Sequence, residues 1–323
     1  MNRFHSIALA AAAALAVAPA VAQAQAFPEK AITFVVPFAA GTATDQIARA
    51  IGNGVTAETR QPVVIDNKAG ASGFIASQQV AKAAPDGYTV LITTNTTHAA
   101  NEHLFKKLPY DPVKDFAPIG ALGKGGQIMV VNPAFPAKTV AEFVALAKKE
   151  PGKYTFGSGS SSSRIAGELL QQMADIKLLH VPYKSNTLAV TDLLGGQISM
   201  MITDAATGLP QIKGGKLRAL GVSGASRSPL APEVPTIAEA GVKGYEMGYW
   251  FAAYAPAKTP PAVVKRLNEL LTRAAKSEAA KAAFYEPTGT EVFTTSPEEL
   301  AKFQTGESQK WGRIVKAAGI EAE

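Results

Sequence analysis

Residues 31–45 read AITFVVPFAAGTATD, and this stretch indicates the fold more clearly than any other part of the chain. Its first half, Ala31–Phe38, is a continuous run of mostly β-branched and aromatic residues, which is typical of a strand buried on both faces. Small and hydroxylic residues follow, and Thr44–Glu58 then shows the spacing of an amphipathic helix that opens near Asp45. A buried strand, a small-residue loop and a helix are the repeating unit of a parallel α/β sheet.

The same alternation continues directly after this unit. We predict a strand at Pro62–Asn67, a helix at about Gly73–Ala83 and, after the turn Pro85-Asp86-Gly87, a strand at Tyr88–Thr93. This order predicts a mostly parallel sheet with helices on both faces.

The pattern starts again after Pro133, where Thr139 and Glu142 form a capping box ahead of an apolar-periodic helix. The further elements that we expect are a strand at Tyr154–Gly157, a helix at about Ser163–Ala174, strands at Lys177–Val181, Ile198–Thr203 and Leu217–Ser223, a short helix opened by Thr236 and Glu239, a helix with Pro260 at its first position after Thr259, and a last helix starting at Ser296-Pro297-Glu298-Glu299.

Two successive α/β units in 323 residues predict two lobes that close like a clam-shell on a ligand at the hinge. We expect the chain to cross into the second lobe near Gly123–Gln127 and to return near Tyr249–Ala255. The first lobe is then discontinuous, with residues 27–124 and 249–323, and the second lobe holds residues 125–248.

The N-terminus has the form of a secretory signal peptide. Arg3 precedes the apolar run Ile7–Val17 and the small-residue segment 22–26, AQAQA. We expect removal after Ala26, with Ala24 as the alternative, and a periplasmic protein. A membrane anchor is the competing interpretation, but the run is shorter than the roughly 20 residues that a spanning helix needs.

Composition narrows the function further. The chain has no cysteine, which excludes disulfides, a lipid-bearing cysteine and thiolate chemistry. Its net charge of +6 is spread along the chain and only 7% of its residues are aromatic, which is unlike a nucleic-acid binder. Enzyme motifs such as G-x-S-x-G, H-E-x-x-H and the Walker A sequence are absent, and His98 and His103 are not spaced to share one helix face. We therefore predict no enzyme, no cofactor and no metal site.

Three loops that follow predicted strands are rich in small and hydroxylic residues, and we expect the ligand there. Such loops expose backbone N–H groups next to the positive end of a helix, which suits an anion, and an arginine grips a carboxylate with two hydrogen bonds. The candidate contacts are Phe38, Ala39, Ala40, Gly41, Thr42, Ala43, Thr44 and Asp45 in the first loop, Thr94, Asn95 and Thr96 in the second, Ser158, Ser160, Ser161, Ser162 and Arg164 in the third, and in addition Tyr183 and Asp204.

Plainer interpretations stay open for the same residues. Glycine, serine and threonine also form ordinary turns and caps. Asp45 also fits a helix cap that never touches ligand, and Arg164 also fits a side chain that faces solvent or stabilises the surface between the lobes.

Several ordered segments of the chain are recognisable together: Val36–Asp45, Gln61–Val64 (QPVV), Ala83–Thr89 (AAPDGYT), Leu108–Phe116 (LPYDPVKDF), Val181–Lys184 (VPYK), Asp192–Gln197 (DLLGGQ), Gly215–Leu220 (GKLRAL) and Val234–Gly241 (VPTIAEAG). In these segments the chain resembles the Bug family, the TctC-like substrate-binding proteins of tripartite tricarboxylate transporters. The resemblance covers essentially the whole mature chain.

This resemblance implies a type II periplasmic-binding-protein fold of the Venus-flytrap kind, which binds di- or tricarboxylates, acidic amino acids or aromatic acids. It also implies that backbone amides of loops 38–45 and 158–164, often with bridging waters, hold a carboxylate. The chain departs from the family pattern at Ala40 and Thr42, at Ser158 and Ser160, and at Arg164, where many relatives carry histidine. The permanent charge of Arg164 makes a dicarboxylate, aliphatic or aromatic, our leading ligand.

We accordingly predict a monomeric protein that captures a small carboxylate and docks transiently on membrane transporter subunits. The alternative is the ligand-presenting component of a periplasmic sensor system, which would use the same cavity.

Overall fold

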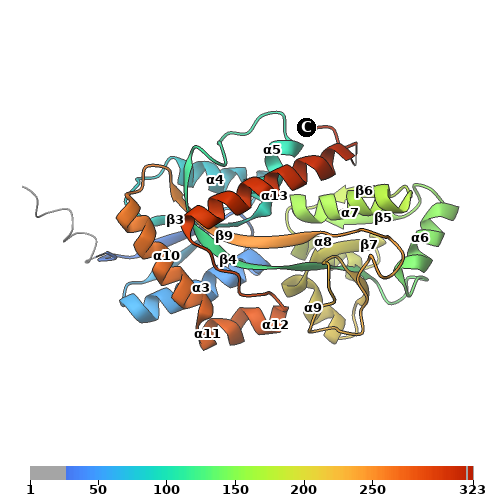
Figure 1. The fold of residues 1–323 in the computed structure, drawn as a ribbon. Coiled ribbons are helices and arrows are strands. Elements are labelled where there is room, and N and C mark those ends of the chain that lie inside the picture. The colour runs from blue at the N-terminus through green and yellow to red at the C-terminus, as the bar shows by residue number, and fades with distance from the viewer. Residues whose placement is uncertain (1–26, 318, 323) are drawn as a thin grey trace, which may run out of the picture.

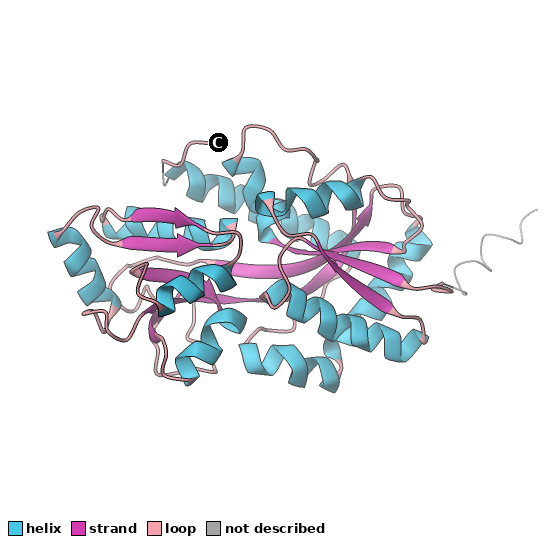
Figure 2. Ribbon diagram, turned by 180° about the vertical axis from the view of Figure 1, so that it is seen from behind, coloured by secondary structure: helices cyan, strands magenta, loops and turns pink. Residues whose placement is uncertain are grey.

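The protein folds into two α/β lobes that are joined by two long strands running through the middle of the molecule (Figures 1 and 2). The structure, a computed structural model, describes residues 27–317 and 319–322. The predicted signal peptide, residues 1–26, lies outside the described residues. Within the described chain, no helix combines the length and the apolar character needed to cross a membrane.

The first lobe is built on three parallel strands in the order β2-β1-β3. They are β1 (Ile32–Val36), β2 (Val63–Asn67) and β3 (Thr89–Thr94), and the helices between them are α3 (Ala43–Thr59) and α4 (Phe74–Ala81). All five elements form where the sequence predicts them, with ends shifted by at most two residues. Strand β1 is buried almost throughout, as its unbroken apolar run requires.

The linking strands are β4 (Phe116–Val131) and β9 (Gly248–Pro256), which pair antiparallel with each other. Strand β9 also pairs with β3, so it belongs to the sheet of the first lobe. Strand β4 pairs with β9 as far as Gly126 and with β7 and β8 from Gln127 onward. The sheet is therefore parallel only within β2-β1-β3 and β7-β5-β6, and the expectation of a mostly parallel sheet does not extend to the strands that join the lobes.

The second lobe repeats the alternation of strands and helices. Its strands are β5 (Thr155–Ser158), β6 (Leu179–Pro182), β7 (Met200–Asp204) and β8 (Arg218–Val222), and its helices are α6 (Val140–Lys149), α7 (Ser161–Ala174), α8 (Asn186–Leu194) and α9 (Ala205–Lys213). The predicted cap of α6 is confirmed, since the Glu142 N–H donates to Thr139 Oγ1 at 3.1 Å.

One predicted helix is wrong. Thr236 and Glu239 do form a capping box, with hydrogen bonds of 2.8 and 2.9 Å, but only turns follow. Gly241 and Gly244 both have positive φ angles, of 114° and 78°, which a helix does not accommodate. The capping box therefore closes a turn.

The remaining elements complete the first lobe and its outer surface. They are η1 (Ala71–Gly73), η2 (Thr96–Ala100), α5 (Asn101–Leu104), α10 (Pro261–Lys276), α11 (Glu278–Ala280), η3 (Lys281–Tyr285), α12 (Glu286–Thr288) and α13 (Pro297–Ala317). Pro260 is the N-cap of α10 rather than its first residue. The long helix α13 lies along the first lobe and reaches toward α7 of the second (Figure 1).

Candidate ligand-binding site

A cavity of about 40 Å³ lies between the two lobes, at the ends of the strands that lead into α3, α7, α8 and α9. It is lined by Phe38, Thr42, Ala43, Thr44, Thr94, Asn95, Gln127, Gly159, Ser160, Ser162, Ser185, Asn186, Asp204, Tyr249 and Phe251. Residues from all three predicted loops therefore meet at one place, although Phe38 in the first loop and Ser162 in the third are far apart in the chain.

Nine of the predicted contacts line this cavity: Phe38, Thr42, Ala43, Thr44, Thr94, Asn95, Ser160, Ser162 and Asp204. The other nine lie outside its lining: Ala39, Ala40, Gly41, Asp45, Thr96, Ser158, Ser161, Arg164 and Tyr183. Two signals pointed to some of the missed residues, because Gly159 stands within the predicted third loop and Ser185-Asn186 precedes an apolar-periodic segment. Gln127, Tyr249 and Phe251 lie in the two segments where the chain was expected to cross between the lobes, but nothing in the sequence marked them individually as contacts.

Four helices begin at the cavity wall, and three of them are capped by side chains. Ser160 accepts a hydrogen bond from Ser163 N–H, Ser185 from Leu188 N–H, and Asp204 from Thr207 N–H. Helix α3 differs, because its N-cap residue Thr42 makes no capping hydrogen bond. The Thr42 hydroxyl instead donates to Ala39 O at 2.7 Å. The N–H groups that open α3 therefore lack a side-chain cap, and they belong to a segment that lines the cavity.

Asp45 stabilises the first loop by hydrogen bonds to its backbone and to neighbouring side chains. Its carboxylate accepts hydrogen bonds from Gly41 N–H at 2.9 Å, Arg49 Nε at 3.0 Å and Asn67 Nδ2 at 3.0 Å. Burial raises the pKa of Asp45, but the hydrogen bonds from Arg49, Gly41 and Asn67 outweigh burial and hold the pKa below its ordinary value. Asp45 thus fixes the turn at Gly41, whose φ of 82° suits glycine.

Arg164 lies in the first turn of α7, outside the cavity lining. Its charge acts on Glu168, one turn further along the helix. Burial raises the pKa of Glu168, and the nearby positive charge of Arg164 offsets part of that increase. The structure thus places Arg164 next to a helix neighbour and gives it no place among the residues around the cavity.

Three other predicted contacts make hydrogen bonds within the protein. Ser161 Oγ donates to Asn101 Oδ1 at 2.9 Å, which ties the second lobe to the first beside the cavity. Ser158 Oγ lies 2.7 Å from His180 Nε2, and the Tyr183 hydroxyl donates to Asp192 Oδ2 at 2.8 Å. These side chains hold the loops in place around the cavity.

His98 is a core residue rather than a ligand contact. Its ring is fully buried and stacks on Tyr254 with a centroid distance of 3.9 Å. Nδ1 lies 2.8 Å from Thr97 Oγ1. Burial lowers the pKa of His98 to about 3, so the ring is neutral at physiological pH. Within the described chain, no group of three histidine, aspartate or glutamate side chains is placed to hold a metal ion.

Asn186 connects three of the helix starts around the cavity. Its Oδ1 accepts hydrogen bonds from Gly159 N–H and Ser163 Oγ, both at 3.0 Å, and its Nδ2 donates to Asp204 Oδ2 at 3.0 Å. Gly159 packs so closely that an added Cβ would lie 1.8 Å from the backbone of Ser185. One amide therefore sets the relative positions of the starts of α7, α8 and α9.

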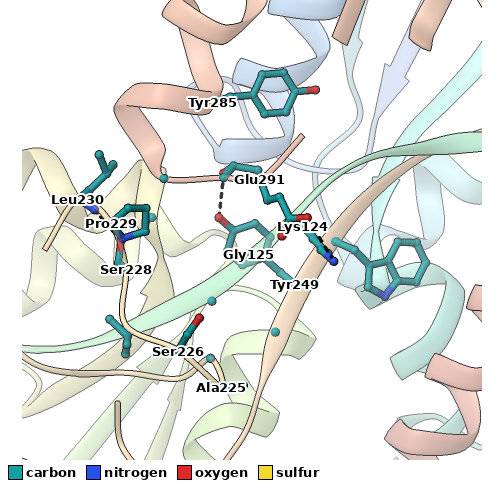
Figure 3. A pocket seen from close by; sticks show the side chains of 18 of the residues that line it. Lys124, Gly125, Ala225, Ser226, Ser228, Pro229, Leu230, Tyr249, Tyr285 and Glu291 are labelled. Carbon is teal, nitrogen blue, oxygen red and sulfur yellow. Dashed lines mark hydrogen bonds and ion pairs between the residues drawn. The ribbon is translucent and has the colours of Figure 1, made fainter. Parts of the chain in front are cut away.

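A larger groove of about 850 Å³ runs along the linking strands β4 and β9 (Figure 3). Ser228, Pro229 and Leu230 form one side of it, and Tyr249 separates it from the cavity. Its charged side chains are largely paired with each other or with neighbours, as in the ion pairs Lys124–Glu291 at 3.4 Å and Lys310–Glu307 at 3.8 Å. Since the groove collects neither the predicted loops nor a set of helix starts, the smaller cavity is the better candidate for ligand binding.

Comparison with known proteins identifies the family of this chain. The sequence pattern of the family described as tripartite tricarboxylate transporter family receptor matches residues 47–320. The chain belongs to this family. As a member of the tripartite tricarboxylate transporter receptors, it is a periplasmic solute-binding protein of the Bug type and not an enzyme.

Three solved structures show how similar the fold of this receptor is to others. Rpa4515 from R. palustris, solved with adipate, is 33% identical with a TM-score of 0.89, and the match covers 92% of this chain and 100% of that one. The periplasmic binding protein BugD is 32% identical with a TM-score of 0.87 and the same coverage. MatC from Rhodopseudomonas palustris, solved with malate, is 31% identical with a TM-score of 0.84, covering 90% and 100%. These relatives confirm the predicted two-lobed fold.

Proposed function

We propose that this protein captures a small carboxylate, with a dicarboxylate as the leading candidate, between its lobes and delivers it to the membrane subunits of a tripartite tricarboxylate-type transporter. The observation that carries the proposal is the start of α3, which borders the cavity without a side-chain cap. An anion is the natural acceptor for the N–H groups of an uncapped helix start.

The side chains around the cavity leave the recognition of an anion to the backbone, since the charged side chain among them is the carboxylate of Asp204. None of the described residues that line it is lysine, arginine or histidine. The negative charge of a ligand is then met by N–H groups and by the positive ends of helices, each worth about 0.3–1 kcal/mol at exposed sites and up to about 2 kcal/mol when partly buried. The choice of a dicarboxylate rests on the adipate and malate held by Rpa4515 and MatC, rather than on Arg164.

The size of the cavity supports a closing mechanism. A volume of about 40 Å³ holds only a few waters, since one water needs roughly 10–15 Å³ of such space. A dicarboxylate is larger, so the lobes, residues 27–124 with 249–323 and residues 125–248, separate to admit it. Ligand binding then shifts the equilibrium toward a closed form that the transporter recognises. We include in the proposal export as a monomer after removal of residues 1–26.

A thermal-shift screen of the mature protein tests ligand binding. Adipate, malate, aromatic acids and tricarboxylates are compared, and a ligand that binds only the folded state raises the melting temperature by mass action. Thr42→Phe places a ring at the uncapped start of α3 and is expected to abolish the shift while the protein stays folded. Thr305→Phe, on the exposed face of α13, is the matched control and keeps the shift.

No shift with any carboxylate, or an unchanged shift in Thr42→Phe, would contradict the proposed site. Delivery is tested separately in vesicles that contain the transporter's membrane subunits. Uptake that requires the ligand-loaded protein supports the transporter, whereas loaded protein that drives no uptake contradicts delivery.

A further inference from the structure

Two buried amides line the cavity with unpaired oxygen atoms. Asn95 is fully buried and Gln127 is only 1% exposed. Neither Asn95 Oδ1 nor Gln127 Oε1 has a hydrogen-bond partner within residues 27–317 and 319–322. Asn95 Nδ2 donates weakly to Gly248 O at 3.5 Å. The amide nitrogen of Asn95 is thus used within the protein, while its oxygen is not.

A third acceptor stands beside Gln127. Gln127 and Asp204 are directly opposed in the antiparallel pair of β4 and β7. Opposed residues of an antiparallel pair place their side chains on the same face, with Cβ atoms about 4.5–5.5 Å apart. Asp204 also lines the cavity, where Oδ2 accepts from Asn186 and Oδ1 accepts from Thr207. Acceptor oxygens of Asn95, Gln127 and Asp204 therefore line the same cavity as the uncapped start of α3.

A buried acceptor without a hydrogen-bond partner lowers the equilibrium constant for forming the structure that buries it by a factor of about 5 to 150. A ligand recovers this cost when it supplies the missing donor. A plain dicarboxylate is ionised at neutral pH and has no such donor. Hence the helix starts account for a carboxylate, but they leave Asn95 and Gln127 unexplained.

We propose that the ligand carries a hydrogen-bond donor, a hydroxyl or an ammonium group, on the carbon chain beside its carboxylate, and that Asn95 Oδ1 and Gln127 Oε1 accept from it. The ligand class is thus hydroxy- or amino-substituted carboxylates. This inference rests on the proposed function, because it assumes that the same cavity holds the carboxylate.

Matched ligands test the inference. Titration calorimetry compares succinate with malate and aspartate, and glutarate with 2-hydroxyglutarate and glutamate. The wild-type protein is expected to bind a substituted member of at least one series about 10-fold or more tightly than the unsubstituted acid. Preference for the hydroxyl or the ammonium member identifies the donor. Equal affinities within both series would overturn the inference, whereas no binding of any acid would overturn the proposed function itself.

Variants assign the preference to the two amides. Gln127→Leu and Asn95→Leu remove an acceptor at nearly constant size, and each should reduce the preference for the substituted ligand by about 5-fold or more. Gln197→Leu, at an exposed position, is the control and keeps it.

Gln127→Leu also removes a buried unpaired acceptor, so its ligand-free melting temperature should equal or exceed that of the wild type. An unchanged preference in folded Gln127→Leu would overturn the role of Gln127. Gln127→Leu also removes the donors of the amide. A loss of the unsubstituted acid as large as that of the substituted one in this variant would mean that Gln127 donates to the carboxylate, which contradicts the proposal.

Discussion

Replacing Asn186 with aspartate should make ligand binding depend on pH. The new carboxylate still accepts from Gly159 N–H and Ser163 Oγ, which lie 3.0 Å from Asn186 Oδ1. Its other oxygen, however, takes the place of Nδ2, which donates to Asp204 Oδ2 at 3.0 Å. Two carboxylates then face each other at the cavity, where the wild type has an amide and a carboxylate.

The size of the effect follows from Coulomb's law. Two like charges 4 Å apart repel by about 4 kcal/mol at an effective dielectric constant of 20. Since 1.36 kcal/mol corresponds to one pKa unit, this repulsion raises the pKa for loss of the last proton from the pair of carboxyl groups from about 4 to about 7. Because the folded-state pKa lies above the unfolded value, the variant keeps its stability below about pH 4 and loses it as the pH rises through about 7.

The assay is titration calorimetry of wild type and Asn186→Asp at pH 6.0 and 8.5, with a ligand from the screen. At pH 6.0 the pair holds one proton, and the variant should bind within about 3-fold of wild type. At pH 8.5 both carboxylates are charged, so they push the starts of the helices apart and repel the anionic ligand. Binding should then weaken by about 10-fold or more relative to wild type. Asn53→Asp, at an exposed position, controls for added charge. The same variant-to-wild-type ratio at both pH values would refute the role assigned to Asn186.

Two further predictions concern stability. Gly159→Ala should lower the melting temperature and weaken binding, because the added Cβ would lie 1.8 Å from the Ser185 backbone. Gly306→Ala, in α13 with open space around it, should instead stabilise the protein by about 0.5–1 kcal/mol. Equal changes of melting temperature in the two variants would contradict this. Burial lowers the pKa of His98 from 6.5 to about 3, so its stabilisation is present above pH 6.5 and is lost as the pH falls, by about 2 kcal/mol at pH 5 relative to pH 7.5. Denaturant unfolding at both pH values should show that His98→Phe removes this loss and that His103→Gln retains it; an unchanged loss in His98→Phe would contradict the assignment.

The sequence was sufficient for elements whose signal is local. The unbroken apolar run of β1 and the caps at Thr139 and Ser296 predicted their strand and helices, because burial pattern and capping depend on neighbouring residues. The helix expected after Thr236 does not form, because a capping box determines only one turn and the positive φ of Gly241 prevents a second turn.

We expected the chain to cross between the lobes near Gly123–Gln127 and Tyr249–Ala255, but the two long strands at these places could not be predicted. Strand β4 contains Gly120, Gly123, Gly125 and Gly126, which interrupt any apolar alternation. Gly125 is glycine because the Tyr249 hydroxyl lies 2.5 Å from the position of an added Cβ, and that contact joins residues far apart in the chain. Without these strands, Gln127, Tyr249 and Phe251 could not be assigned to the cavity.

The sequence predicted which loops border the candidate site, but not which of their side chains line it. Three loops rich in small residues do meet at the cavity, because each follows a strand that ends there. Which side chains turn inward depends on contacts between distant segments. Asp45 accepts a hydrogen bond from Asn67, and burial raises the pKa of Glu168 by an amount that the charge of Arg164 partly offsets. Neither interaction can be inferred from the sequence of the loops.

A structure of the protein with bound ligand, solved after the screen has identified one, tests the central claim most directly. We predict that a carboxylate oxygen of the ligand lies within hydrogen-bond distance of the N–H groups at Ala43 and Thr44, which open α3. A ligand seated instead in the larger groove along the linking strands, against Lys124 or Lys310, would contradict the account.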